Sequence, residues 1–365
     1  MRFSKGLAPQ PGVALAAFGT LGVGGPARWF VRAEQPDEVA AARAWCEEQG
    51  LSWFILGGGS NVVIADRGFD GLVVQIGIRG TALSCDGDDS LITAGAGESW
   101  DGFVSMAVER GLAGVECMSG IPGTVGGTPI QNVGAYGQEV SNTIERVEVY
   151  DCEEHVLRTL SAAECGFAYR TSRFKTADAG RFVVCAVTFR LRPGAPNTTY
   201  PDVARHLRQA GAARPGLDDV REAVLTIRRS KGMVVHPDDP DSRSVGSFFV
   251  NPAVSVADRE RIAATAGEVP PGFPADDGRV KIPAAWLIER SGFRKGHIAG
   301  AAGISTRHPL ALVNRGGATA ADIVRLARAV KQAVGDRFGV WLKPEPVFVG
   351  FEDDDDVAFL TRAQD

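Results

Sequence analysis

Two glycine-rich stretches constrain this chain more than any other feature of its sequence. The first is Gly57-Gly58-Gly59-Ser60-Asn61, and the second runs from Ser119 to Gly127 (SGIPGTVGG). Glycine permits a backbone with positive φ and lets a ligand approach the main chain closely. Consecutive N–H groups in such turns form concave anion sites. Two of these loops in one chain suit a ligand with a pyrophosphate and a long body, such as a dinucleotide.

Neither loop has the sequence of a common nucleotide-binding motif. Neither matches the Rossmann pattern G-x-G-x-x-G with its following helix and distant acidic residue, and neither ends in the Gly-Lys-Ser/Thr of a P-loop. Each loop follows an apolar run and precedes another ordered segment. If these loops hold a nucleotide cofactor, they do so in another fold.

Composition narrows the class of protein. The 365 residues, 44% hydrophobic and 23% charged, are typical of a globular chain with two or three domains. The net charge of -5 argues against nucleic acid as the main partner. No apolar run is long enough to cross a bilayer, and Met1–Leu7 lacks the apolar core of a signal peptide. We therefore expect a cytoplasmic monomer that binds neither nucleic acid nor membrane.

The cysteines and histidines indicate no metal site. None of the six cysteines forms a C-x-x-C pair, their spacings fit no zinc pattern, and the five histidines are scattered. In a chain expected in the cytosol, buried free thiols are the simplest interpretation.

Sequence patterns divide the chain at Arg192–Asn197, where prolines and a glycine interrupt the apolar runs. Before this break, Pro36 opens a helix that Gly50 closes, and Ser99 can cap a second helix that runs to Arg110. The expected strands of this α/β region are Trp53–Leu56, Asn61–Ile64, Leu72–Ile76, Ser90–Ala94, Val147–Tyr150 and Phe182–Phe189.

The second region has its own pattern of helices and strands. Its clearest helix runs from Ala320 to Arg337, where Thr319 and Asp322 resemble a capping box before an apolar stripe. The acidic run Glu352–Asp356 is expected to be solvated and without function. Further helices are expected over Val220–Lys231 and Ala284–Arg290, and strands over Ser247–Val250 and Ala311–Asn314.

Six motifs in fixed order carry a resemblance to a known family. Together they resemble the UDP-N-acetylenolpyruvoylglucosamine reductases, enzymes of peptidoglycan-precursor synthesis, over roughly residues 15–351. The motifs are Ile55–Asn61 (ILGGGSN), Met118–Gln138 (MSGIPGTVGGTPIQNVGAYGQ), Tyr169–Lys175 (YRTSRFK), Gly246–Pro252 (GSFFVNP), Lys281–Glu289 (KIPAAWLIE) and Trp341–Glu345 (WLKPE).

The resemblance implies an α+β fold. An FAD-binding domain of the vanillyl-alcohol-oxidase (PCMH) type, built from two α/β subdomains, is expected over residues 15–195. An α+β substrate-binding domain follows over residues 196–338, then a strand with Glu345 (339–351) and an acidic tail (352–365). Thr199–Val203 looks like the tyrosine-bearing loop that closes over the substrate in the longer form of the family.

The resemblance also implies the reaction and its catalytic residues. The reaction is NADPH-dependent reduction of UDP-N-acetylglucosamine enolpyruvate to UDP-N-acetylmuramate through bound FAD. Arg170 would stabilise the substrate enolate, Ser247 would donate a proton, and Glu345, held extended between two prolines, would assist at the enolate. Taken alone, each residue also has a structural interpretation. Arg170 could be a surface arginine, Ser247 a small residue at the start of a strand, and Glu345 an exposed charge.

The resemblance also implies the binding residues. The loops would cradle the FAD pyrophosphate through Gly57, Gly58, Gly59, Ser60, Asn61, Ser119, Gly120, Ile121, Pro122, Gly123, Thr124, Gly126 and Gly127. The substrate would contact Tyr136, Tyr200, Lys231, Asn251 and His308.

Two other functions remain open at this point. The first is another flavin oxidoreductase of the same fold, which would not combine the Ser247 and Glu345 motifs. The second is a non-catalytic nucleotide-binding module, which would explain the glycine loops but not Arg170, Ser247 and Glu345. The chain departs from the family pattern at Val250, where a polar residue is frequent, and in the proline-rich stretch Glu268–Pro274.

Overall fold

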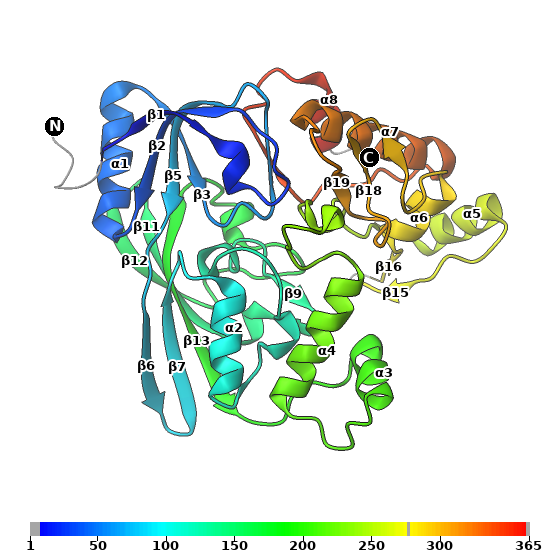
Figure 1. Ribbon diagram of the computed structural model, residues 1–365, viewed down its shortest axis with the longest axis horizontal. Coiled ribbons are helices and arrows are strands. Elements are labelled where there is room, and N and C mark those ends of the chain that lie inside the picture. Colours follow the sequence, from blue (N-terminus) through cyan, green and yellow to red (C-terminus); the bar gives the residue numbers. More distant parts are fainter. Residues whose placement is uncertain (1–7, 276–277, 363–365) are drawn as a thin grey trace. The chain divides into compact units, whose positions relative to one another are not determined.

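The chain folds into two compact units, shown in the computed structural model of Figure 1. Residues 8–275 and 278–362 are described, so Met1–Leu7, which in sequence lacks the apolar core of a signal peptide, lies outside them. Of the described residues, the first unit contains 8–13, Ala27–Gly59 and Asp70–Ser230. The second unit contains Ala14–Pro26, Ser60–Phe69, 231–275 and 278–362.

A four-stranded sheet and one helix form the first half of the first unit. Strands β3 and β5 are parallel, and helix α1 (Pro36–Gln49) precedes β3 in the chain. Pro36 stands at the first turn of α1, and Gly50 ends it in the left-handed conformation, with φ of 62°. In sheet order the strands are β1 (Gln10–Ala14), β2 (Pro26–Ala33), β5 (Phe69–Ile76) and β3 (Ser52–Leu56).

A larger antiparallel sheet forms the second half of the first unit. Helix α2 (Trp100–Glu109) follows its N-cap Ser99 as predicted and lies against this sheet in Figure 1. The ring of Phe103 on α2 packs on that of Phe189 in β13, with 4.5 Å between the ring centroids. The two sheets correspond to the two expected α/β subdomains. In sheet order the strands are β12 (Val156–Ser161), β11 (Ile144–Asp151), β13 (Phe182–Pro193), β7 (Asp89–Gly95) and β6 (Thr81–Asp86), and β8 (Leu112–Ala113) pairs with the end of β13.

Two helices beyond β13 also belong to the first unit. Helices α3 (Pro201–Gln209) and α4 (Leu217–Ser230) bury apolar side chains around Cys117. For this reason the first unit ends after Ser230 and not near residue 195, where the sequence pattern placed the boundary. Thr199–Val203, expected to be a loop, includes the start of a helix. Tyr200 occupies the N-cap position of α3, and Pro201 is the first residue of the helix.

The second unit is built from short strand pairs around a long helix, α7 (Ala320–Phe338). Strand β4 (Val62–Ile64) pairs in parallel with β20 (Val347–Val349). The remaining strands are β14 (Ala253–Val254), β16 (Val280–Lys281) and β15 (Phe273–Pro274), then β17 (Ile298–Ala299), β18 (Ala302–Ile304) and β19 (Leu312–Asn314). The remaining helices are α5 (Val256–Ala266), α6 (Ala284–Arg290) and α8 (Asp355–Thr361).

The capping box predicted for α7 is present. Thr319 Oγ1 accepts a hydrogen bond from the Asp322 N–H at 3.1 Å, and the Asp322 carboxylate accepts one from the Thr319 N–H at 3.0 Å. Side chains of the apolar stripe, including Ile323 and Val330, are fully buried. The helix therefore begins where its local sequence specifies and is stabilised by core packing.

The acidic run near the C-terminus is largely exposed, as expected, but it also begins a helix, α8, that the sequence analysis did not predict. Asp354 caps α8, accepting a hydrogen bond from the Val357 N–H at 2.9 Å, and Asp356 pairs with Arg328 of α7. Lys331 of α7 is buried, and its Nζ donates to the carbonyls of Phe359 and Leu360 at 2.9 and 2.7 Å. These contacts fix α8 on α7, although residues 363–365 of the expected tail lie outside the described part.

Three smaller observations complete the fold. The expected strand at Ser247–Val250 is not formed, and only an isolated bridge joins Phe249 to Pro344. Cys85 is exposed, whereas the other five cysteines are buried and free. Across residues 8–275 and 278–362, no helix is both long and apolar enough to span a bilayer.

Candidate active site

The two glycine loops meet in the first unit. An added Cβ on Gly58 would lie 2.6 Å from the Cα of Gly123, and one on Gly57 would lie 3.1 Å from the Thr124 hydroxyl oxygen. Gly59 and Gly123 have φ of 62° and 120°, a backbone region that side chains disfavour. Glycine at these positions lets the two main chains touch and turn together.

The contact between the loops brings together main-chain donors that the protein does not use. Among the described residues, the N–H groups of Gly58, Gly59, Gly123 and Thr124 have no acceptor in the protein. The N–H groups of Ser119, Gly120, Gly126 and Gly127 do have protein acceptors and are not available to a ligand. Free main-chain N–H groups that lie close together can bind an anion.

An ion pair fixes the second loop against helix α4. Asp101 accepts the Gly120 N–H at 2.6 Å and a bidentate contact from Arg221 at 2.7 and 3.0 Å. Burial opposes ionisation of Asp101, but the hydrogen bonds from Arg221 and Gly120 hold its pKa below the usual value. The ionised Asp101 carboxylate therefore holds the start of the second glycine loop in place through the Gly120 N–H. No motif in the sequence indicated this role.

Arg170 stands in a tight two-residue turn. Ala168 and Thr171 exchange both main-chain hydrogen bonds, and Arg170 has φ of 55°. Its guanidinium donates to the carbonyls of Gly134 at 2.7 Å and Asn132 at 3.5 Å. No carboxylate of the described residues pairs with it, so its charge is held in place but not neutralised. A non-glycine residue in this strained backbone is itself a signal of function.

Asn132 links this turn to the next one, a role that sequence reasoning missed. The side chain is buried, and its Nδ2 donates to Glu139 at 2.8 Å and to the Ala168 carbonyl at 3.1 Å. The Ser141 N–H donates to its Oδ1 at 3.1 Å, and φ of Asn132 is 48°. One amide thus connects the Arg170 turn with the hairpin that follows.

That hairpin presents Tyr136. Strands β9 (Gly134–Ala135) and β10 (Gln138–Glu139) are joined by Tyr136 and Gly137, both with positive φ, as a type I′ turn requires. The Tyr136 ring meets that of Tyr200 edge-on, 5.2 Å between centroids. Burial raises the pKa of the Tyr136 phenol, while Arg228 of α4 acts in the opposite direction. The structure therefore pairs two residues predicted separately as substrate contacts.

Ser247 and Glu345 are brought together within the second unit. The Glu345 N–H donates to the Phe248 carbonyl at 2.9 Å, beside the bridge from Phe249 to Pro344. Within the described residues, the Ser247 hydroxyl has no hydrogen-bond partner. Gly246, with φ of 77°, makes the turn that leads into Ser247. Two predicted catalytic residues, far apart in the sequence, lie on adjacent backbone segments.

Asn61 and Asn251 both support this region structurally. Asn61 Nδ2 donates to the Glu345 carbonyl at 3.3 Å, and the Asn61 carbonyl accepts the Val347 N–H at 3.0 Å. Asn251 Oδ1 accepts the Ala284 N–H at 2.9 Å, at the start of α6. The Asn251 Nδ2 group has no acceptor in the part of the chain that the structure describes, so it can still serve a ligand.

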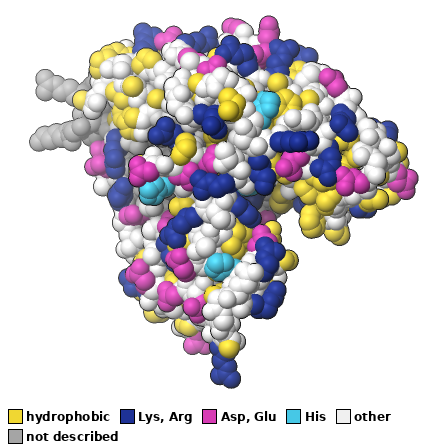
Figure 2. Space-filling model, turned by 45° about the vertical axis from the view of Figure 1, so that its right-hand side comes forward, with side chains coloured by type: hydrophobic (Ala, Val, Ile, Leu, Met, Phe, Trp, Pro, Cys, Tyr) yellow, Lys and Arg dark blue, Asp and Glu magenta, His cyan; other side chains and the backbone are white. Residues whose placement is uncertain are grey.

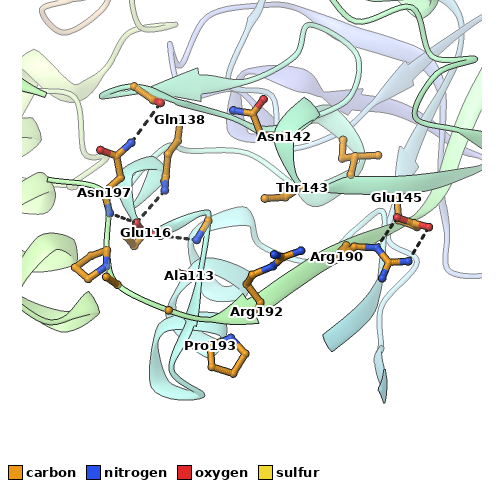
Figure 3. Close-up of a pocket in the computed structure, with 16 residues that line it drawn as sticks. Ala113, Glu116, Gln138, Asn142, Thr143, Glu145, Arg190, Arg192, Pro193 and Asn197 are labelled. Carbon is orange, nitrogen blue, oxygen red and sulfur yellow. Dashed lines mark hydrogen bonds and ion pairs between the residues drawn. The ribbon is translucent and has the colours of Figure 1, made fainter. Parts of the chain in front are cut away.

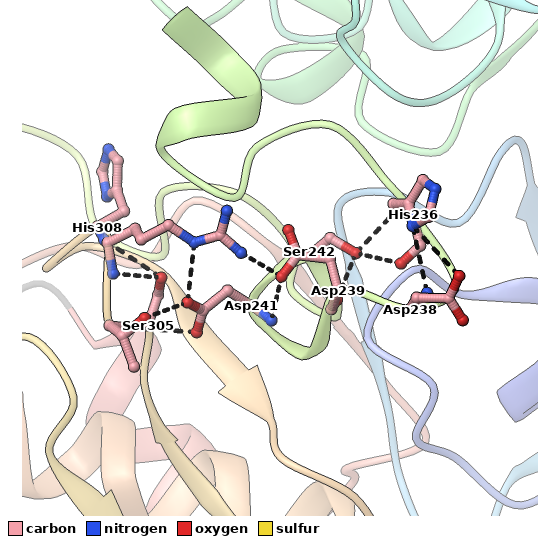
Figure 4. Close-up of polar contacts among 9 residues, drawn as sticks. His236, Asp238, Asp239, Asp241, Ser242, Ser305 and His308 are labelled. Atoms are coloured by element: carbon pink, nitrogen blue, oxygen red, sulfur yellow. Dashed lines mark hydrogen bonds and ion pairs between the residues drawn. The ribbon is translucent and has the colours of Figure 1, made fainter. Parts of the chain in front are cut away.

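The buried carboxylate of Asp241 lies between the turn that carries His308, drawn in Figure 4, and the Lys231–Gly232 turn. Asp241 accepts the Thr306 N–H and the Arg307 Nε–H, both at 3.1 Å. Burial opposes its ionisation, but hydrogen bonds from Thr306 and Arg307 hold its pKa below the usual value. An added Cβ on Gly232 would lie 3.0 Å from the Asp241 Cβ, so the Lys231–Gly232 turn packs directly on it. Asp241 was not among the predicted residues.

Basic and acidic side chains are interspersed on the face in Figure 2, with no extended region of one sign.

The predicted site residues are distributed over both units. The first unit holds Gly57–Gly59, Ser119–Gly127, Tyr136, Arg170 and Tyr200, and the second holds Ser60, Asn61, Lys231, Ser247, Asn251, His308 and Glu345.

Comparisons with known proteins agree with this geometry. Residues 238–349 match the family model described as UDP-N-acetylenolpyruvoylglucosamine reductase, C-terminal domain, and residues 27–160 match an FAD binding domain. The chain is 50% identical over 348 residues to the UDP-N-acetylenolpyruvoylglucosamine reductase of Thermobifida fusca, covering 93% of this chain and 97% of that protein. It is 48% identical over 350 residues to the reductase of Streptomyces avermitilis, covering 93% and 94%.

A solved structure gives the same result for the fold. The crystal structure of UDP-N-acetylenolpyruvylglucosamine reductase (MurB) from Thermus caldophilus superposes with a TM-score of 0.64 at 25% identity, covering 94% of this chain and 99% of that one. The fold, together with the two glycine loops that meet at Gly58 and Gly123, defines an FAD-containing oxidoreductase. The predicted fold class is confirmed. The chain belongs to the UDP-N-acetylenolpyruvoylglucosamine reductase family.

Proposed function

We propose that this chain reduces UDP-N-acetylglucosamine enolpyruvate to UDP-N-acetylmuramate with NADPH, in peptidoglycan precursor synthesis. The observation that carries the proposal is the backbone pairing that places Ser247 beside Glu345. Family membership over 93% of the chain supports the same reaction. We further propose that the protein acts as a cytoplasmic monomer.

The first unit is proposed to hold FAD, and the second to hold most of the substrate contacts. The free N–H groups of Gly58, Gly59, Gly123 and Thr124 fit the cofactor's pyrophosphate. When bound, FAD supplies the hydride chemistry that links NADPH to the vinyl carbon of the substrate. The protein's own residues then have to orient the substrate, stabilise charge and supply one proton.

Ser247 is proposed to supply that proton. Hydride addition to the terminal vinyl carbon leaves a carbanion on the adjacent carbon, delocalised into the substrate carboxylate as an enolate. That carbon is basic enough to accept a proton from an oriented hydroxyl. The absence of any protein partner for the Ser247 hydroxyl, within the described residues, supports a role toward a ligand. The resulting alkoxide has to be reprotonated by water or by a neighbouring group.

Arg170 and Glu345 are proposed to act on the same enolate. A guanidinium held only by carbonyls keeps its full charge for an oxyanion or a carboxylate, as the contacts of Arg170 with Gly134 and Asn132 permit. Glu345 stands in an extended backbone next to Phe248, from which its side chain can assist enolate formation and protonation.

The UDP part of the substrate is proposed to contact the remaining predicted residues. Lys231 would pair with the pyrophosphate as a point charge, and Asn251 would use its free Nδ2 group. Tyr200, stacked edge-on with Tyr136, would cover the substrate as in the longer form of the family. His308 would contact the substrate from the turn that Asp241 holds.

An anaerobic titration tests the proposal. Purified protein should show a flavin spectrum that one equivalent of NADPH bleaches and one equivalent of the enolpyruvyl substrate restores. A colourless protein would favour the nucleotide-binding module. Bleaching without reoxidation by the enolpyruvyl substrate would favour a flavin oxidoreductase with a different substrate.

A further inference from the structure

We propose that Glu116 is a positioning residue for Tyr200, acting through the segment that leads into helix α3. The inference rests on the proposed function in one respect, namely that Tyr200 covers the substrate. Glu116 lies outside every motif used to predict the site. Its importance comes from what its carboxylate holds.

The Glu116 carboxylate is completely buried and accepts three hydrogen bonds. Its Oε2 accepts the Gly114 N–H at 2.8 Å, and its Oε1 accepts both the Gln138 Nε2–H at 2.9 Å and the Asn197 N–H at 2.8 Å. Figure 3 shows these contacts converging from three parts of the chain. A buried carboxylate requires such partners, because an ion without them is costly to bury.

One arm of this cluster leads to Tyr200. Asn197 also donates through Nδ2 to the Gly137 carbonyl at 3.5 Å, and the Cys117 thiol lies 3.3 Å from the Asn197 carbonyl. The Asn197 Oδ1 accepts the Thr199 N–H at 3.0 Å and its hydroxyl at 2.7 Å. Tyr200 comes next and caps α3. The hydrogen bonds of Glu116 with Asn197, and of Asn197 with Thr199, thus fix the start of α3.

The other arm leads to Tyr136. Gln138 donates to Glu116 and accepts the Cys117 N–H at 2.8 Å through its Oε1. It follows directly after the Tyr136–Gly137 turn. One carboxylate therefore holds the segments that carry both rings of the Tyr136–Tyr200 pair.

An adjacent cavity makes these hydrogen bonds decisive for the segment. A cavity of about 560 Å³ lies beside Pro193–Asn197, and it is also lined by Asn142 and Arg192 (Figure 3). Pro193, Gly194 and Ala195 are exposed to solvent, so little of this part of the segment is held by burial. We therefore expect the loss of the Asn197 contact to move the segment, and Tyr200 with it.

An exchange of the two polar residues removes the Asn197 contact selectively. In the double variant Glu116→Gln with Gln138→Glu, total charge is unchanged and the pair 116–138 keeps its hydrogen bond with donor and acceptor reversed. Residue 116 then turns its amide nitrogen toward residue 138 and its oxygen toward the Gly114 N–H, and residue 138 still accepts the Cys117 N–H. The Asn197 N–H alone loses its acceptor.

Steady-state and half-reaction kinetics give the first test. The exchange variant should retain its FAD and its rate of bleaching by NADPH, while KM for the enolpyruvyl substrate rises roughly tenfold or more, the scale for an unpaired buried donor. In a Tyr200→Ala background the exchange should raise KM no further, since it acts through Tyr200. Effects that multiply in the combined variant, or an unchanged KM in the exchange variant, would overturn the inference.

Hydrogen exchange gives a second test that does not depend on turnover. Amides of residues 194–200 should exchange faster in the double variant, whereas those of Ser119–Gly127 should be unchanged. Equal exchange of residues 194–200 in the two proteins would overturn the anchor. If this acceleration is found but the wild-type protein fails to reduce the enolpyruvyl substrate, the positioning role stands and the proposed function is the part that fails.

Discussion

A Cβ atom on Gly58 would lie 2.6 Å from the Cα atom of Gly123, so the two glycine loops can meet only because residue 58 has no side chain. Glycine-rich cofactor loops are usually explained by ligand approach to the main chain. Here the same residues are also required for contact between the loops themselves. The cradle of free N–H groups depends on that contact.

The first prediction concerns Gly58→Ala. The added methyl group forces the loops apart, which disperses the N–H donors, so the purified variant should carry little or no FAD. The ratio of flavin to protein absorbance measures this directly, with circular dichroism to show that the variant is folded. Gly194→Ala is the matched control, because its Cβ would have no neighbour closer than 3.7 Å. A folded Gly58→Ala protein with normal flavin content contradicts the prediction.

The second prediction concerns the C-terminal helix. Ending the chain after Gly350 removes the carbonyls of Phe359 and Leu360 that accept from the buried Lys331 Nζ. Leaving the ammonium without acceptors should lower the free energy of unfolding by at least ~2 kcal/mol. Urea unfolding of the shortened chain, compared with the full chain, measures the loss.

Lys331→Met separates this cause from the general loss of helix α8. In the shortened chain the substitution should recover part of the lost stability, because methionine needs no acceptor. In the full chain the same substitution should destabilise. Identical effects of Lys331→Met in the two chains would show that the carbonyls of α8 do not matter to Lys331.

The third prediction concerns acid stability and Asp151. This buried carboxylate accepts from Arg181 at 2.8 and 3.1 Å, and these hydrogen bonds lower its pKa from 3.8 to about 2 against the opposing effect of burial. The unfolded chain therefore binds more protons between about pH 4 and pH 2. The stability that Asp151 provides is complete above about pH 4 and is lost as the pH falls toward 2.

Arg181→Gln tests this dependence. The variant should be less stable at pH 7, and its free energy of unfolding should fall less steeply than that of the wild type between about pH 4 and pH 2. Arg205→Gln, which removes only the exposed pair with Asp202, should leave the slope unchanged. A wild-type slope in Arg181→Gln would mean that another carboxylate governs the acid transition.

Local signals explain which elements the sequence could predict. Pro36 and Gly50 mark the ends of α1, and Thr319 with Asp322 marks the start of α7, because caps are formed by residues within one turn of each other. Helix α8 was missed because its stability comes from Arg328 and Lys331 in a different helix. The boundary after Ser230 likewise depends on packing around Cys117.

The same division holds for the candidate site. The motifs identified residues with reactive or donor groups, such as Arg170 and Ser247. They did not identify Asn132, Glu116 or Asp241, whose roles consist of contacts between distant segments. A weak local signal existed only for the hairpin, where Gly137 follows Tyr136 in a two-residue turn.

The fourth prediction concerns Arg170→Lys. Lysine keeps the charge but cannot form the planar, multiple contacts with the Gly134 and Asn132 carbonyls that orient the guanidinium. We expect flavin reduction by NADPH to be nearly unchanged and reoxidation by the enolpyruvyl substrate to slow by roughly 10²-fold or more. Arg173→Lys, whose ion pair with Asp178 lies near the same turn, is the control. If the flavin of Arg170→Lys is reoxidised by the enolpyruvyl substrate at the wild-type rate, Arg170 does not take part in the reaction.

The fifth prediction concerns Ser247, which is needed only after hydride has reached the substrate. Ser247→Ala should leave bleaching by NADPH close to normal and slow reoxidation by the enolpyruvyl substrate by at least ~100-fold, the lower scale for losing a general acid. Glu345→Gln should separate the half-reactions in the same way, because its backbone is paired with Phe248 beside Ser247. Stopped-flow absorbance of the flavin measures each half-reaction separately.

Two further variants decide between proton donation and a purely structural role for Ser247. Ser247→Cys should retain part of the rate, since a thiol also donates a proton, whereas Ser244→Ala removes a nearby hydroxyl that accepts the Gly246 N–H and should change the two half-reactions equally if at all. Because the Ser247 hydroxyl has no partner among the described residues, its removal leaves no buried group unsatisfied. Equal slowing of both half-reactions in Ser247→Ala would therefore point to a changed pocket and would exclude Ser247 as the proton donor.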